Sequence, residues 1–304
     1  MIEQDQANSK CGFVTIIGAP NAGKSTLTNL LVGTKVTIVS PKVQTTRSTI
    51  RAIMVEDNAQ LIFCDTPGIF KAEKTLEKAI VASALEQLSN AGEVLLLIDV
   101  TKKNSKANQL IFEILANRSK KILLALNKID LIAKNDLLPM IAKYEAMGIF
   151  SEIFLLSALK DEGVVELKQS LIKRAPVSPF LYPEDQAADI PSKFLAAEIT
   201  REKLFLELRE ELPYNLSVET ESWQVQPNGS IKIDQVIYVM RHGQKKILIG
   251  KKGESLKKIG SASRVELAEI FATKIHLYLH VKVKENWTED KHMYAHMHLN
   301  FPKN

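Results

Sequence analysis

The chain has 304 residues, of which 45% are hydrophobic and 25% charged, and its formal net charge is +5. This length favours two domains over one, and the composition is that of a globular protein. No apolar run lasts for about 18 residues, and residues 1–10 contain no apolar core. We therefore expect neither a membrane-spanning helix nor a secretion signal. The two cysteines, Cys11 and Cys64, are expected to be free thiols.

The first motif is the string GAPNAGKS at residues 18–25, which matches the phosphate-loop pattern G-x-x-x-x-G-K-[ST]. It follows the apolar run 12–17, a predicted buried strand, and precedes residues 25–31, a predicted helix start. The glycines let backbone amides turn inward around phosphate oxygens, and Lys24 would reach the terminal phosphates while Ser25 binds magnesium. The residues predicted to contact the nucleotide here are Gly18, Ala19, Pro20, Asn21, Ala22, Gly23, Lys24, Ser25 and Thr26.

The second motif is Asp65-Thr66-Pro67-Gly68, at the end of the predicted strand 60–64. On its own this string indicates a surface turn. After a phosphate loop it indicates a magnesium-binding carboxylate, Asp65, and a backbone amide, that of Gly68, for the γ-phosphate. All four residues are predicted to line the nucleotide site.

A switch threonine is expected between these two motifs. We predict Thr46 as the residue that binds magnesium and the γ-phosphate, with Thr45 as the close alternative. The predicted magnesium ligands are therefore Ser25, Thr46 and Asp65. The flexible loops at 40–47 and 68–75 would reorganise when the phosphate leaves.

The third motif, Asn127-Lys128-Ile129-Asp130, ends the predicted strand 122–126. The Asp130 carboxylate can accept hydrogen bonds from N1–H and the amino group of guanine, and adenine lacks both donors. Asn127 would tie this loop to the phosphate loop, and the stem of Lys128 would lie on the ring. After the predicted strand 153–156, Ser157 and Ala158 would place a backbone amide near the guanine oxygen. The motifs together predict GTP or GDP with Mg²⁺ as ligands.

The pattern of strands and helices changes near residue 176. Before it, strands alternate with helices predicted at 77–88, 105–117, 136–147 and 164–173, and 49–55 with 60–64 form a predicted antiparallel hairpin. This predicts an α/β P-loop NTPase of the Ras-like type, a mostly parallel sheet with helices on both faces. Four prolines between 176 and 191 indicate a semi-rigid linker. The predicted segments are a tail at 1–10, a GTPase domain at 11–175, a linker at 176–192, a second domain at 193–290 and a tail at 291–304.

The second domain is predicted to be a small α+β unit with the order α-β-β-α-α-β, in which helices at 193–210 and 254–274 and strands at 217–226, 230–240 and 275–284 are the best defined. Residues 241–258 carry seven lysines and arginines against one acidic residue, Glu254. The string Gly250-Lys251-Lys252-Gly253 matches the G-x-x-G loop of a type II KH domain, in which glycines let a nucleic-acid backbone come close and lysines meet its phosphates. The predicted RNA-binding residues are Lys245, Lys246, Ile249, Gly250, Lys251, Lys252, Gly253 and Lys257, with Ile247 and Leu248 also in an apolar groove wall.

The chain resembles the Era family of bacterial GTPases that end in a KH domain. The resemblance is carried by GAPNAGKS, SPKVQTTR at 40–47, DTPG, NKID, EITREKL at 198–204, EELPY at 210–214 and IGKKGESLKKIG at 249–260. It implies binding to the 3′ end of small-subunit ribosomal RNA, a role in small-subunit assembly, a monomeric protein, and a cytoplasmic location with peripheral association with the inner membrane. Two residues depart from the family pattern, Phe70 and Thr288.

Hydrolysis must proceed without a catalytic glutamine, because Ile69 stands directly after the motif glycine. We expect slow basal turnover that relies on Lys24, Thr46, Gly68 and Asn21. Asn21 is hypothesised to bind a potassium ion, since the string PNAGKS resembles potassium-stimulated GTPases; the alternative is that Asn21 simply fits the loop.

Three further alternatives remain open on the sequence. The chain could be a GTPase acting on a membrane or protein partner with a KH-like scaffold, whereas an RNA-modifying enzyme is disfavoured because no nucleophile or metal cluster is recognisable. His292, His296 and His298 are more in keeping with a solvated tail than with a metal site. Trp287 and Tyr278 are candidate stacking surfaces, although half-buried packing is the preferred interpretation of Tyr278.

Overall fold

The computed structural model describes residues 9–102, 105–116 and 122–302. Contacts divide the chain into two compact units. The first unit contains the residues up to Thr37 together with Thr46–Asp189, and the second contains Ile38–Thr45 together with the residues from Ile190 onward. The expected domain limits differ from this division at residues 38–45, which belong to the second unit, and at the expected linker 176–192, which is divided between the two units after residue 189. The expected tail from residue 291 onward is also grouped with the second unit. Most of the expected N-terminal tail, the last residues of the C-terminal tail, and position 117 of one predicted helix lie outside the described residues.

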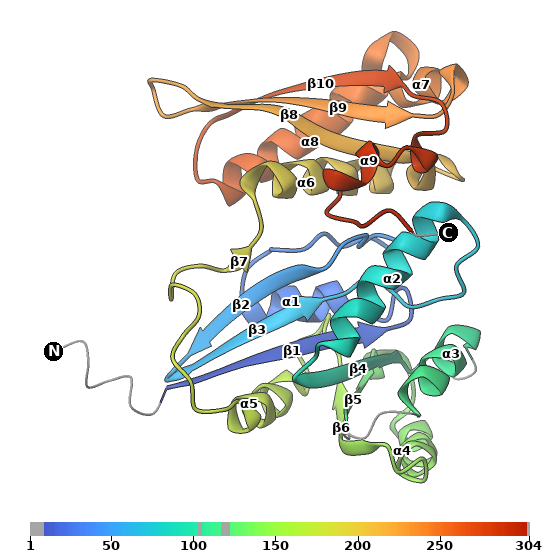
Figure 1. The fold of residues 1–304 in the computed structure, drawn as a ribbon, viewed down its shortest axis with the longest axis vertical. Helices are drawn as coiled ribbons and strands as arrows, with labels where there is room; N and C mark the ends of the chain where they lie inside the picture. The colour runs from blue at the N-terminus through green and yellow to red at the C-terminus, as the bar shows by residue number, and fades with distance from the viewer. Residues whose placement is uncertain (1–8, 103–104, 117–121, 303–304) are drawn as a thin grey trace, which may run out of the picture. The chain divides into compact units, whose positions relative to one another are not determined.

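The first unit is built on a seven-stranded sheet with the order β6-β5-β4-β1-β3-β2-β7 (Figure 1). Strands β1, β3, β4, β5 and β6 run parallel to one another, and β2 runs antiparallel to β3 as the predicted hairpin requires. The fold is therefore the predicted P-loop NTPase. The strands are β1 (Lys10–Gly18), β2 (Ile50–Glu56), β3 (Ala59–Asp65), β4 (Glu93–Asp99), β5 (Ile122–Asn127), β6 (Phe150–Leu156) and β7 (Ala188–Asp189).

Helices cover both faces of this sheet (Figure 1). Apolar residues of α1 and α5 share one core with one sheet face, and those of α2, α3 and α4 share another core with the opposite face. The strands are almost continuously apolar because both of their faces are buried. The helices are α1 (Lys24–Val32), α2 (Thr75–Ser89), α3 (Lys106–Leu115), α4 (Leu137–Glu145) and α5 (Val164–Arg174).

Residues 176–189, expected to be a semi-rigid linker, are attached to the first unit in the structure. The buried side chain of Gln60 accepts hydrogen bonds from the amides of Leu181 and Tyr182 and donates one to the carbonyl of Tyr182. The segment then forms β7, which pairs with β2. The linker interpretation is wrong for these residues, because prolines prevent regular structure without preventing a side chain from binding the backbone between them.

The second unit has the predicted order α-β-β-α-α-β. Its sheet has the order β10-β9-β8, with β10 parallel and β8 antiparallel to β9. The long third helix of this order ends at Ile270, four residues before its predicted end, and Ala272 just beyond it takes a positive φ of 46°. The elements are α6 (Ser192–Glu207), β8 (Leu216–Val225), β9 (Ile231–Val239), α7 (His242–Ile249), α8 (Glu254–Ile270), β10 (Ile275–Val283) and α9 (His292–Ala295).

The C-terminal segment is part of the core of the second unit, which corrects the expected solvated tail. Met293, Tyr294, Met297 and Leu299 are buried, and His296 Nε2 lies 2.8 Å from the hydroxyl of Ser217. The apolar side chains recur along one side of a short helical turn, and this spacing signals burial. Among the described residues, no helix combines the length and apolarity needed to cross a membrane.

Candidate functional site

The predicted nucleotide-binding motifs meet at one edge of the first unit. Gly18, Asp65 and Asn127 stand at the carboxyl ends of β1, β3 and β5. Because these strands are parallel, their carboxyl ends lie along the same edge, where open α/β sheets bind their ligands. The sheet therefore brings together three motifs that are far apart in the sequence.

Lys24 is buried inside the phosphate loop. Its ammonium group donates hydrogen bonds to the carbonyls of Gly18 at 3.2 Å and Ala19 at 3.1 Å, and the side chain is 6% exposed. Burial lowers the pKa of Lys24 to about 8, and the nearby Asp65 carboxylate opposes this shift. A buried cation whose hydrogen bonds go to carbonyl oxygens is suited to an incoming phosphate, which would supply further negative charge.

Asn127 fastens the base-binding loop to the phosphate loop, as predicted. Its Nδ2 donates to the carbonyl of Ala22 at 2.8 Å, and it is 2% exposed. A Cβ atom on Gly23 would lie only 2.3 Å from this Nδ2, and Gly23 has a φ of 98°. Glycine is thus required at this position both by the backbone conformation and by the close approach of Asn127.

Ser25, Thr46 and Asp65, the three predicted magnesium ligands, lie together. The hydroxyl of Ser25 donates to Asp65 Oδ2 at 2.8 Å and lies 2.9 Å from the hydroxyl of Thr46. The hydroxyl of Thr45, the alternative switch residue, donates instead to the carbonyl of Lys42. This geometry favours Thr46 over Thr45.

These three residues fit magnesium chemically. All the donor atoms are oxygens, which Mg²⁺ prefers. Burial raises the pKa of Asp65 to about 6 against the opposing effects of Ser25, Lys24 and Thr37. Asp65 Oδ1 is buried and lacks a hydrogen-bond partner among the described residues. An unpartnered buried carboxylate oxygen is costly, and a hydrated cation would satisfy it.

Lys128 is held in place by a residue that the sequence analysis missed. Its ammonium donates to Asp99 Oδ2 at 2.7 Å and to the carbonyl of Asn21 at 2.8 Å. Burial tends to raise the pKa of Asp99, but hydrogen bonds from Lys128 and Thr101 outweigh it and hold that pKa below its ordinary value. Asp99 ends β4, a strand not predicted from the sequence. A polar residue directly after an apolar run, the signal that identified Asp65, would have found it.

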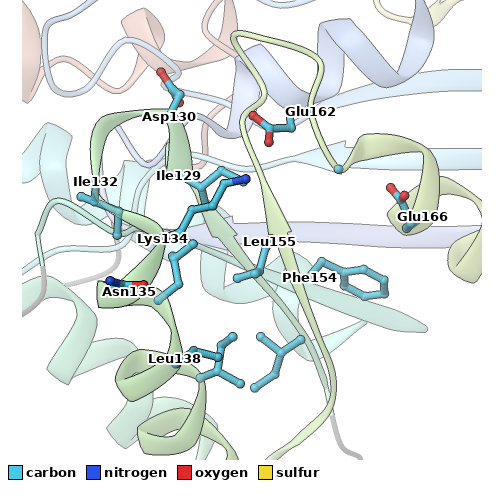
Figure 2. Close-up of a pocket in the computed structure, with 14 residues that line it drawn as sticks. Ile129, Asp130, Ile132, Lys134, Asn135, Leu138, Phe154, Leu155, Glu162 and Glu166 are labelled. Carbon is cyan, nitrogen blue, oxygen red and sulfur yellow. The ribbon is translucent and has the colours of Figure 1, made fainter.

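Asp130 is exposed and lies at the rim of a cavity of about 940 Å³ beside the base-binding loop (Figure 2). Figure 2 shows Asp130 and Glu162 toward one end of this cavity and Leu138 toward the other. The walls come from α4, β6 and the start of α5. The carboxylate is thus accessible to a base, and most of the residues that line the cavity are apolar.

Two predicted contacts need qualification. The amide of Ala158, expected near the guanine oxygen, is donated to Asn127 Oδ1 at 3.0 Å, so it can serve the base only by sharing or by rearrangement. Ile69 is fully buried in the core, and its amide donates to the carbonyl of Gly18 at 3.1 Å. Its side chain is therefore turned away from any attacking water.

The predicted RNA-binding loop is an open turn between α7 and α8. Lys246, Lys251, Lys252 and Lys257 are exposed, and Lys245 is half-buried. Gly253 has a φ of 81°, and a Cβ atom there would meet no atom within 4 Å. The turn thus presents a basic surface that an extended phosphate backbone could approach closely.

The apolar residues of this region divide between surface and core. Ile247 is 65% exposed and Ile249 is half-buried, so both can line a groove. Leu248 is fully buried and packs in the core, which corrects its predicted place in the groove wall. The three residues are consecutive on a helix, so they cannot all face one way.

The two candidate stacking residues, Trp287 and Tyr278, differ in their exposure. Trp287 is fully buried, and its indole donates to the carbonyl of Asn215 at 3.1 Å, so it is no stacking surface. Tyr278 is exposed, at 50%, with the Lys232 ammonium 5.5 Å from its ring centre, so the preferred interpretation of half-buried packing is not confirmed. No group of three or more metal-binding side chains is found among His, Cys, Asp and Glu of the described residues. Both cysteines are buried free thiols, as expected.

Comparison with known proteins places the chain in a family. A family described as 50S ribosome-binding GTPase matches residues 13–128, and the KH domain family matches residues 211–288. The GTPase Era of Afipia carboxidovorans is 47% identical over 303 residues, which cover 100% of this chain and 98% of that protein. The chain belongs to the Era family of GTPases. The second unit is accordingly a KH domain.

Other relatives agree with this membership. The GTPase Era of Mesorhizobium japonicum is 49% identical over 291 residues, covering 96% of this chain and 94% of that protein. The crystal structure of an Era in complex with MgGDPNP and nucleotides 1506–1542 of 16S ribosomal RNA matches with a TM-score of 0.91 and 37% identity, covering 95% of this chain and 98% of that one. An Aquifex aeolicus Era variant bound to GDP·AlF4⁻ matches with a TM-score of 0.89 and 36% identity.

Proposed function

We propose that the chain binds and slowly hydrolyses GTP with Mg²⁺, and that its KH domain binds the 3′ end of small-subunit ribosomal RNA to assist assembly of that subunit. The observation that carries the nucleotide half is the cluster of Ser25, Thr46 and Asp65 with its unpartnered buried carboxylate oxygen. The RNA half is supported by the exposed basic turn at 250–253 and by the relative solved with 16S ribosomal RNA.

The residues of the first unit divide the chemistry between them. When bound, magnesium would neutralise charge on the β- and γ-phosphates. Lys24 binds the same phosphates and the Gly68 amide binds the γ-phosphate, so charge that develops on the leaving oxygens is stabilised. The side chain of Ile69 can neither accept nor donate a hydrogen bond, so it cannot orient the attacking water as a glutamine would. Slow turnover follows, which is suited to a timed switch.

Asn21 is proposed to bind a potassium ion that supplies the positive charge of an arginine finger. Its φ of 63° and the hydrogen bond from Lys128 to its carbonyl fix the backbone that would place its side chain. We expect GTP turnover to be several-fold faster in potassium than in sodium buffer, and Asn21→Ala to remove the difference. Equal rates in both buffers would refute the potassium site.

The RNA half is tested by reversing charge on the turn. We expect the variant carrying Lys251→Glu and Lys252→Glu to bind an oligonucleotide of the small-subunit rRNA 3′ end at least about tenfold more weakly, because each lost lysine also removes a released counterion. The matched control carries Lys274→Glu and Lys291→Glu, an equal charge change. Lys274 is exposed beyond the opposite end of α8, about 25 Å along that helix.

Equal weakening by both double variants would show a general charge effect, and unchanged binding by the first would leave the KH domain as a scaffold for a membrane or protein partner. A scrambled oligonucleotide of the same length that binds equally well would refute recognition of the rRNA end.

We propose that the protein acts as a monomer in the cytoplasm, where subunits are assembled, and associates peripherally with the inner membrane.

A further inference from the structure

The central part of the loop between α1 and β2 is grouped with the second unit, not with the GTPase sheet. Asn29 holds the loop at its beginning, because its side chain accepts from the amides of Val36 and Thr37 and donates to the carbonyl of Thr37. Thr46 returns to the first unit, where its hydroxyl lies beside that of Ser25. Between these points, residues 38–45, here called the switch segment, belong to the same compact unit as α6.

Helix α6 binds the backbone of the switch segment at both of its ends. The amide of Val39 donates to Glu202 Oε1 at 2.7 Å, and Nη2 of Arg201 donates to the carbonyl of Thr45. Lys42 in the middle of the segment donates to the carbonyl of Phe205 in the last turn of α6. Ile38, which is 1% exposed, packs in the apolar cluster that contains Ala196 and Ile199.

The charged residues that make these contacts are themselves buried and held. Arg201 and Glu202 are each 2% exposed. Glu198 receives two hydrogen bonds from the guanidinium of Arg201, from Nε at 2.7 Å and from Nη2. Lys203 pairs with the second oxygen of Glu202 at 3.0 Å. Burying apolar residues on a helix face costs less free energy than burying ions. These charged side chains are therefore best explained by their hydrogen bonds to the backbone of the segment.

The hydrogen bonding of the Arg201 guanidinium is incomplete in this arrangement. Its Nη1 is buried without a hydrogen-bond acceptor among the described residues. An unsatisfied buried donor raises the free energy of the state that contains it. An arrangement of the switch segment that gave Nη1 an acceptor would therefore compete with this one.

Thr45 and Thr46 share one peptide plane, which links the contact of Arg201 with the Thr45 carbonyl to the position of Thr46 beside Ser25. The carbonyl oxygen of Thr45, bound by Arg201, is fixed relative to the Cα atom of Thr46 because the peptide bond is planar. A displacement of the Thr46 backbone toward a metal or phosphate therefore moves that carbonyl as well. Any ligand that draws Thr46 inward thus acts directly on the bond to Arg201.

We propose that Arg201 and Glu202 are positioning residues that couple the switch threonine to the KH domain: α6 holds the switch segment, and nucleotide and RNA each bias the same held segment. This inference rests on the proposed function, since it names the device by which the nucleotide controls RNA binding. The device is reciprocal, because coupling between two binding sites has the same magnitude from either side.

The experiment uses the full-length protein and an oligonucleotide of the rRNA 3′ end. The dissociation constant of the RNA is measured with GDP and with a non-hydrolysable GTP analogue, and the ratio of the two is the coupling factor, expected to lie between about 5 and 150 in the unmodified chain. Glu202→Gln weakens the acceptor for the amide of Val39. Arg201→Lys keeps a positive charge beside Glu198, but its single ammonium group cannot also reach the carbonyl of Thr45 as the guanidinium does. We expect both to bring the ratio to within about twofold of 1, and the effect of RNA on analogue affinity to shrink equally.

Two further variants complete the design. Glu269→Gln changes the same charge on the exposed side of α8 and is expected to keep the ratio of the unmodified chain. Lys42→Ala removes a contact that the switch segment itself makes with α6, the hydrogen bond to the carbonyl of Phe205. It leaves no buried charge without a partner, so it tests the proposal even if the Arg201→Lys protein fails to fold. It is expected to lower the ratio in the same direction by a smaller factor.

The outcomes separate the inference from the function on which it rests. A ratio unchanged in folded Glu202→Gln and Lys42→Ala proteins, when the unmodified chain shows nucleotide-dependent RNA binding, overturns the coupling device alone. A ratio of 1 in the unmodified chain, or no RNA binding, overturns both. Equal loss of RNA affinity with GDP and with the analogue, at an unchanged ratio, would show that α6 has only a structural role.

Discussion

The proposed nucleotide site and the proposed RNA-binding turn are suited to phosphates by opposite means. In the first unit Lys24, Asp65 and Asn127 are at most 6% exposed, and each has defined partners on the backbone or on a neighbouring side chain. In the second unit the lysines of the turn at 250–253 are exposed. The first site discriminates by fixed geometry in a medium of low dielectric constant, where misplaced groups are costly. The second attracts by charge that water and salt screen.

The largest effect is expected where geometry alone selects the ligand, at Asp130. Asp130→Asn replaces an acceptor of two guanine donors by an amide, and we expect GDP affinity to fall by about 3 kcal/mol, or about 100-fold. Xanthine carries a carbonyl in place of the amino group, so xanthosine diphosphate should bind the variant better than GDP does. Titration of both nucleotides measures this.

Asp136→Asn is the matched control for that prediction, because Asp136 is also exposed and lies six residues further along the chain. It should leave both affinities unchanged. If GDP bound equally well to the Asp130→Asn protein, selection of guanine would have to come from another part of the loop.

The nucleotide site could be predicted from the sequence because each of its motifs is local. Gly23-Lys24-Ser25, Asp65 and Asn127 each follow an apolar strand, and parallel strands need no further information to bring such ends together. Asp99 was not predicted as a site residue because the strand that it ends, β4, was not predicted. The site was thus predictable to the extent that its strands were.

The features that could not be predicted depend on contacts between distant segments. Nothing near Gln60 in the sequence indicates that its side chain holds the backbone of residues 181–182. Arg201 and Glu202 look like the charged residues of any exposed helix, and only the fold shows them buried beneath residues 38–45. Met293 and Tyr294 lie in an apolar pattern too short to predict a buried helix, and the neighbouring histidines favoured a solvated tail.

A higher salt concentration should weaken RNA binding more than GDP binding, and this effect should be somewhat smaller than that of Asp130→Asn. If the four exposed lysines Lys246, Lys251, Lys252 and Lys257 each neutralise a phosphate, raising the salt from 50 to 200 mM should weaken RNA binding about 50-fold. GDP affinity should change by less than about threefold, because the phosphate loop is buried and less screened. Fluorescence anisotropy and nucleotide titration over the same salt series compare the two slopes. Parallel slopes would mean that both sites bind by exposed charge.

The smallest effect tests whether the fixed geometry of the nucleotide site extends to Asp99. Asp99→Asn keeps an oxygen that can accept from the amide and hydroxyl of Thr101, which lie 3.0 and 2.6 Å from Asp99 Oδ1, but it removes the charge facing Lys128. We expect GDP affinity to fall by about 1 kcal/mol, or fivefold, as Lys128 loses its orientation.

A double-mutant cycle decides whether Asp99 acts through Lys128. In a Lys128→Met background, Asp99→Asn should change GDP affinity by less than about twofold, because the group it orients is already gone. A fivefold loss that persists in that background would mean that Asp99 supports the loop independently of the lysine. Melting temperatures separate these results from unfolding. A strong coupling would show that the fixed geometry of the site begins at Asp99, the last residue of β4.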